Sequence, residues 1–90
     1  MEMTAVPTQN PDTAARLIDD KVFVLNPETS ELHALNEVGA RIWELADGVR
    51  PVADIVATIE QEYDVSTQSA QADVAGFLDE LVAKGLVTLA

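Results

Sequence analysis

Residues 31–48, ELHALNEVGARIWELADG, indicate the change from sheet to helix, because the spacing of the apolar residues changes within them. Residues 31–35 suit a short β-strand. Beyond Asn36 the apolar residues recur at helical spacing, at Val38, Ile42 and Leu45. Asn36 is a residue type that caps helix N-termini, and Gly48 supplies a helix stop. The stretch therefore predicts a strand that runs into a helix at Asn36.

Upstream of this stretch the sequence predicts the rest of a small β-meander. Residues 22–25, VFVL, are β-branched, aromatic and aliphatic, which favours a strand. A shorter strand is expected around residues 16–19, with a turn at Asp20-Lys21 and a hairpin loop over residues 27–30. Residues 1–13 carry two prolines and no periodicity, so they are predicted to be a flexible lead-in to a domain over residues 14–90.

Downstream, two more helices and a short strand are expected. Pro51 fits the first turn of a second helix, whose apolar stripe runs to Tyr63. Ser66 or Thr67 can cap a third helix that ends before Gly85, and residues 86–89 suit a terminal strand. The predicted fold is therefore α+β and winged-helix-like, with an N-terminal three-stranded antiparallel sheet followed by a three-helix bundle.

Composition excludes several classes of function. The chain has 90 residues, 5 basic and 16 acidic, for a net charge of −11, and it has no cysteine. A disulfide framework, a thiolate zinc site and a cysteine nucleophile are therefore excluded. The acidity argues against nucleic-acid partners and anionic membranes. Without a signal peptide or a long apolar run, a cytoplasmic protein is expected.

The polar residues do not predict a catalytic or metal site. His33 is the single histidine and lacks a convincing nucleophile nearby, so we interpret it as a half-exposed strand residue. The alternating carboxylates of residues 60–64 lack the glycine of a calcium loop, because Val65 stands at that position. We therefore expect no catalytic residue, no metal and no cofactor.

A peptide-binding surface is the remaining hypothesis. If residues 31–35 form a sheet edge beside the third helix, an extended peptide could add to that edge as a strand. The apolar residues of the third helix would form the facing wall or, alternatively, would be core: Val74, Phe77, Leu78 and Leu81. A winged-helix transcriptional regulator and a general protein–protein adaptor are the other hypotheses. The acidity of residues 67–84 disfavours the regulator.

The sequence resembles the PqqD family. Residues 24–48 match its pattern of a strand ending in "LN", a strand–helix junction and "IWxLxDG", and residues 73–87 match its "DVxxFLxxLxxxGLV" tail. Domains of this family are also called RiPP precursor-peptide recognition elements. The resemblance implies a non-catalytic protein that binds the leader of a ribosomally made precursor peptide. It also implies delivery of that peptide to a modifying enzyme, such as a radical-SAM maturase or a leader peptidase.

The resemblance also implies where the leader lies. It would add as a strand against Glu31, Leu32, His33, Ala34 and Leu35, facing a wall of Asp73, Val74, Phe77, Leu78 and Leu81. Strand alternation lets only Leu32/Ala34 or His33/Leu35 face inward, and we favour Leu35 as core. Few basic residues are near this groove, so either apolar anchors matter most or the leader is unusually basic. The chain is expected to be a monomer or a homodimer.

Overall fold

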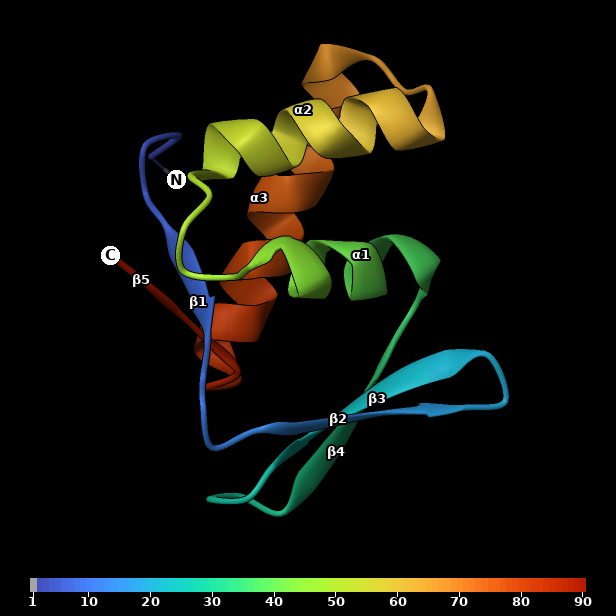
Figure 1. Cartoon of the computed structure of the whole chain (residues 1–90), viewed down its shortest axis with the longest axis vertical. Coiled ribbons are helices and arrows are strands. Elements are labelled where there is room, and N and C mark those ends of the chain that lie inside the picture. The colour runs from blue at the N-terminus through green and yellow to red at the C-terminus, as the bar shows by residue number, and fades with distance from the viewer. Residues whose placement is uncertain (1) are drawn as a thin grey trace.

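The computed structural model describes residues 2–90 and has eight regular elements (Figure 1). In chain order they are β1 (Pro7–Gln9), β2 (Ala14–Ile18), β3 (Lys21–Asn26), β4 (Glu31–Leu35), α1 (Glu37–Leu45), α2 (Val52–Tyr63), α3 (Thr67–Ala83) and β5 (Val87–Leu89). The predicted α+β order, a three-stranded antiparallel sheet followed by three helices, is confirmed.

The three-stranded sheet has the order β2-β3-β4 and is antiparallel throughout. Asp19 and Asp20 connect β2 to β3 and both have positive φ, of 49° and 65°. This is the backbone form of a two-residue hairpin turn, and it lies one residue earlier than the predicted turn. In the register, Val22 faces Leu35 and Val24 faces His33. Val24 and Leu35 are buried, so this face of the sheet packs on the helices.

A second, two-stranded sheet joins the ends of the chain. β1 pairs antiparallel with β5 (Figure 1). In this pairing Pro7 lies opposite Leu89. The side-chain amide of Gln9 donates a 2.7 Å hydrogen bond to the carbonyl of Trp43. This corrects the expectation of a flexible lead-in over residues 1–13, apart from Met1, which lies outside the described residues. The packed part of the chain begins before residue 14, because β1 completes a sheet with the far end of the sequence.

The N-termini of α1 and α3 follow the predicted capping, whereas Pro51 directly precedes α2 and does not lie in its first turn. The Asn36 side chain accepts a 2.7 Å hydrogen bond from the backbone N–H of Gly39, and Ser66 accepts one of 3.1 Å from Ser69. Gly85 has a φ of +73° just after α3, which only glycine adopts without strain. Among residues 2–90, no helix combines the length and the apolar character needed to cross a membrane.

The core lies where the helices meet each other and one face of the sheet. α1, α2 and α3 each bury an apolar stripe, joined by Val24, Leu35 and the start of β5. Asn26 is the buried polar residue at the end of β3, and its amide donates a 2.9 Å hydrogen bond to the carbonyl of Lys84. This bond joins the β3–β4 hairpin to the C-terminal end of α3. It therefore helps to hold β4 in place relative to that helix.

Candidate functional site

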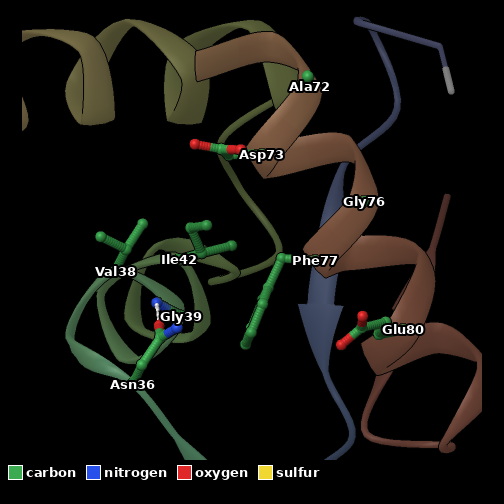
Figure 2. A pocket seen from close by; sticks show the side chains of 9 residues that line it. All are labelled: Asn36, Val38, Gly39, Ile42, Ala72, Asp73, Gly76, Phe77 and Glu80. Carbon is green, nitrogen blue, oxygen red and sulfur yellow. Dashed lines mark hydrogen bonds between the residues drawn. The ribbon is translucent and has the colours of Figure 1, made fainter. Parts of the chain in front are cut away.

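A hollow in the surface lies between α1 and α3. It has a volume of about 430 Å³, and we call it the α1–α3 groove. Figure 2 shows the residues that line it: Asn36, Val38, Gly39 and Ile42 on the α1 side, and Ala72, Asp73, Gly76, Phe77 and Glu80 on α3. The lining combines apolar side chains with two carboxylates and two glycines. Such a mixture suits a polypeptide better than a small apolar molecule.

Phe77 forms the floor of the groove by packing on Gly39. A Cβ atom at position 39 would overlap the Cζ and Cε2 atoms of the Phe77 ring. The α1 helix therefore needs glycine at this position to let the outer edge of the ring approach its backbone. Glycine in a helix costs about 1 kcal/mol relative to alanine, and this contact explains why it is present.

Gly76 is different, because nothing fills the space beside it. A Cβ atom at position 76 would meet no atom within 4 Å. Gly76 lies in the middle of α3, is exposed, and lines the groove. The fold itself therefore does not require glycine here. The missing side chain widens the groove next to Phe77.

The C-terminal end of β4 leads into this groove through Asn36. β4 pairs with β3 on one side and is the last strand of its sheet among the described residues. Leu35 is followed directly by Asn36, which both caps α1 and lines the groove. An unpaired strand edge offers backbone N–H and C=O groups to another extended chain. The structure therefore places an open strand edge next to a partly apolar hollow.

The burial pattern of β4 shows which set of side chains faces inward. Leu35 is buried and His33 is half-buried, whereas Leu32 and Ala34 are exposed. The expectation that Leu35 belongs to the core is confirmed. His33 is half-buried, and its Nε2 atom has no hydrogen-bond partner among residues 2–90. Leu32 is 59% exposed and lies on the opposite face of the sheet from the helices.

Only part of the predicted wall lines the groove. Asp73 and Phe77 do, but Val74, Leu78 and Leu81 are 0–2% exposed and belong to the core. The reason is that α3 must bury one apolar face against the other helices, and these three residues form that face. We therefore remove them from the wall. Apart from Asp73 and Phe77, the residues that line the groove were not predicted from the sequence. Gly39 and Gly76 could have indicated them, because glycine inside a helix is unfavourable unless packing or a ligand requires it.

The charge on the α3 side of the groove is negative. Asp73 and Glu80 are exposed, and neither forms an ion pair within residues 2–90. Arg41 is held elsewhere, by Glu62 at 2.8 Å and Glu44 at 3.1 Å. The hydrogen bond from Arg41 lowers the pKa of Glu62. In the described chain, no three His, Asp or Glu side chains come close enough together to hold a metal ion.

The sequence matches a family model over most of its length. Residues 21–87 match the model described as coenzyme PQQ synthesis protein D (PqqD). The chain belongs to the PqqD family. The matched residues include β3, β4 and all three helices, and so both sides of the groove. Among curated proteins, no sequence matches this one.

Solved structures share the fold of this PqqD-family chain. TbiB1 in complex with the TbiA(beta) leader peptide is 31% identical, with a TM-score of 0.80 over 89% of this chain and 93% of that one. Lasso peptide synthetase B1 complexed with the leader peptide has a TM-score of 0.82 at 22% identity, over 92% and 98% of the two chains, and this likeness concerns the fold alone.

A third similar structure is the PqqD truncation of Methylobacterium extorquens PqqCD, which represents a functional and stand-alone RiPP recognition element. It is 25% identical, with a TM-score of 0.76 over 92% of this chain and 88% of that one. All three likenesses extend over most of both chains. The fold of this PqqD-family chain is therefore also found in a functional and stand-alone recognition element.

Proposed function

We propose that this chain is a non-catalytic recognition element for the leader of a ribosomally made precursor peptide. The leader adds as a strand to β4 and places side chains in the α1–α3 groove. The observation that carries this proposal is the continuity at Asn36, where the open edge of β4 runs into the wall of the groove. Strand addition provides main-chain hydrogen bonds, and the groove provides side-chain selectivity.

The related structures support this proposal. TbiB1, at 31% identity, was solved with a leader peptide bound. On this chain the leader's backbone would lie along Glu31, Leu32, His33 and Ala34. Its side chains would meet Asp73, Gly76 and Phe77 across the groove. Leu35 contributes its backbone only, because its side chain is buried.

The bound leader is delivered to a modifying enzyme, such as a radical-SAM maturase or a leader peptidase. The chain thus contributes binding and its partner contributes the chemistry. The chain acts as a monomer or as a homodimer. If two copies pair through their β4 edges, the leader competes for the same edge, so peptide binding would dissociate the dimer.

A titration followed by amide NMR tests the binding mode. Leader segments of precursor peptides encoded beside the gene are added to the isotope-labelled chain. We expect shifts over residues 31–36 and 72–80, with β4 amides gaining protection from hydrogen exchange. Shifts confined to other surfaces, or none with any such peptide, would contradict strand addition at β4.

A pair of variants provides the control. Phe77→Asp places a charge in the groove and should weaken peptide binding by about 2 kcal/mol or more, as for an anchor in a desolvated pocket. Val49→Asp adds the same charge in the α1–α2 loop, at a residue that is 80% exposed. This second variant should bind like the unmodified chain. Equal losses in both variants would indicate a nonspecific effect of charge.

A further inference from the structure

The carboxylates of the α1–α3 groove indicate what kind of leader binds there, provided that the proposed leader binding is correct. Asp73 and Glu80 leave α3 on the same side as the Phe77 ring, and Gly76 lies between them (Figure 2). The groove therefore presents one negative charge on each side of Gly76, which has no side chain. An acidic leader side chain placed there would be repelled.

No basic side chain of the described chain neutralises these carboxylates. Within residues 2–90, Arg41 pairs with Glu44 and Glu62, and Arg50 pairs with Asp47. Three basic residues remain, Arg16, Lys21 and Lys84, and none of them lines the groove. A positive charge at this position must therefore come from whatever binds.

The position of Gly76 shows where that charge fits. On a helix, side chains three and four residues apart are neighbours. Position 76 is three residues after Asp73 and four before Glu80, so both carboxylates neighbour the space beside Gly76. That space is empty, since a Cβ atom there would meet nothing within 4 Å. A cation from another chain placed over Gly76 would be within reach of both carboxylates.

Phe77 adds an apolar surface beside this space. The alkyl stem of a lysine or arginine can cover an aromatic ring while its charged end stays in water, and the cation is attracted to the ring face. We propose that the leader carries a lysine or arginine whose stem crosses Gly76 and Phe77 and whose charge lies between Asp73 and Glu80. The leader of this chain is therefore basic at this position and not only apolar.

Selection from a random library tests this without knowledge of the natural leader. Short random peptides displayed on phage are selected on the full chain. A selected peptide that contains lysine or arginine is then synthesised with that residue and with norleucine in its place. Norleucine keeps the alkyl stem and removes the charge. Binding of both peptides is measured at low and high salt, and the bound surface is mapped by amide shifts.

Neutralising the two carboxylates provides the matched protein variant. In the unmodified chain, the norleucine peptide should bind roughly three- to tenfold more weakly at low salt, and the difference should shrink at high salt. In the Asp73→Asn/Glu80→Gln variant the two peptides should bind equally. Asp79→Asn removes a charge from the same helix at a residue that does not line the groove, so it should keep the preference.

The outcomes separate this inference from the proposed function. Peptides that shift β4 and the groove, but bind equally well with norleucine, overturn the basic-leader inference and leave leader binding intact. Selected peptides that shift β4 and the groove but contain no basic residue would also overturn the basic-leader inference and leave leader binding intact. If no peptide shifts β4 or the groove, strand addition itself fails, and the charge preference fails with it.

Discussion

The Phe77 ring of α3 lies against the backbone of Gly39 in α1, at a point where a single methyl group would overlap it. This contact brings the two helices together and forms the floor of the α1–α3 groove. It also joins the groove to the N-terminus of α1, because the side-chain oxygen of Asn36 accepts a 2.7 Å hydrogen bond from the backbone N–H of Gly39. The shape of the candidate site therefore depends on one glycine and one aromatic ring.

Gly39→Ala should move Phe77 into the groove. Overpacking costs about 1–3 kcal/mol, whereas alanine improves helix propensity by about 1 kcal/mol. We expect a net loss of about 1 kcal/mol in the free energy of unfolding, together with clearly shifted Phe77 ring resonances. Denaturant unfolding and aromatic NMR measure both effects. Leader binding should also be lost, because the ring then occupies the groove.

Phe77→Leu provides the partner variant for this prediction. Leucine is shorter and leaves room for a Cβ atom at position 39, so Gly39→Ala should be neutral or stabilising in the Phe77→Leu background. The interaction energy from this double-mutant cycle should therefore be favourable. Additive effects of the two substitutions would show that the ring and residue 39 do not compete for space.

Leu78 and Phe77 are neighbours in the sequence but should differ in their effect on stability. Leu78 is 0% exposed, so Leu78→Ala should cost about 2–5 kcal/mol of unfolding free energy. Phe77 is half-buried, so Phe77→Ala should cost only part of the transfer free energy of a buried aromatic side chain, about 1–2 kcal/mol, while reducing peptide binding more. Urea unfolding measures the loss of stability in each variant, and peptide titration measures its loss of binding. A larger stability loss for Phe77→Ala would contradict the assignment of Leu78 to the core.

The sequence predicted those parts of the fold that local patterns determine. The strand at residues 31–35, the Asn36 cap and the positive φ of Gly85 all depend on neighbouring residues, and each is present. β1 was missed because its partner is β5, at the other end of the chain. A strand of three residues has too few positions to show an alternating pattern.

The wall of the groove was predicted only in part, for a different reason. An apolar residue on a helix shows that some face is buried, but not which of two neighbouring faces meets the core. Val74 and Phe77 are one turn apart, and only packing against the other helices separates core from groove. The two helix glycines carried more information, because glycine inside a helix needs an explanation from packing or from a ligand.

Gln9 tests whether the N-terminal segment is part of the packed structure. Its side chain donates a 2.7 Å hydrogen bond to the carbonyl of Trp43, which belongs to a buried residue. Gln9→Ala should therefore cost about 0.5–1.5 kcal/mol, the net value of one hydrogen bond, because the carbonyl keeps its 3.2 Å bond from the backbone N–H of Ala46. Gln61→Ala, at an exposed position of α2, is the control and should change stability little. Equal stability of the Gln9→Ala and Gln61→Ala variants would indicate that the N-terminal segment is flexible and does not pack on α1.

Asp47 should make stability depend on pH in the acid range. The backbone N–H groups of Arg50 and Val49 donate hydrogen bonds of 3.0 and 2.9 Å to its carboxylate, and they lower its pKa. A lowered pKa in the folded state adds stability that is complete above the unfolded value, about pH 4, and is lost as pH falls through the folded pKa.

Asp47→Asn isolates this effect, because the amide keeps an oxygen acceptor and loses the charge. Its unfolding free energy should be lower than that of the unmodified chain at neutral pH. The gap should narrow as pH falls below about 4, where Asp47 itself becomes protonated. Urea unfolding across this pH range measures the gap. A gap that stays constant would show that the Asp47 charge does not stabilise the α1–α2 loop.

Gly76→Ala should stabilise the fold and weaken peptide binding at the same time. The space beside Gly76 is empty, so alanine should add up to about 1 kcal/mol through helix propensity without a clash. The same methyl group projects into the α1–α3 groove, where a leader side chain is expected to pass, so affinity should fall. Gln71→Ala, exposed on α3 but away from the groove, should leave affinity unchanged.

Higher stability together with lower peptide affinity in Gly76→Ala would identify Gly76 as a residue that favours binding at the expense of stability. Loss of stability in Gly76→Ala would contradict the open space at this position. Unchanged affinity with increased stability would show that the bound peptide does not pass over Gly76, and its side chains would then have to lie nearer to Val38 on the α1 side of the groove.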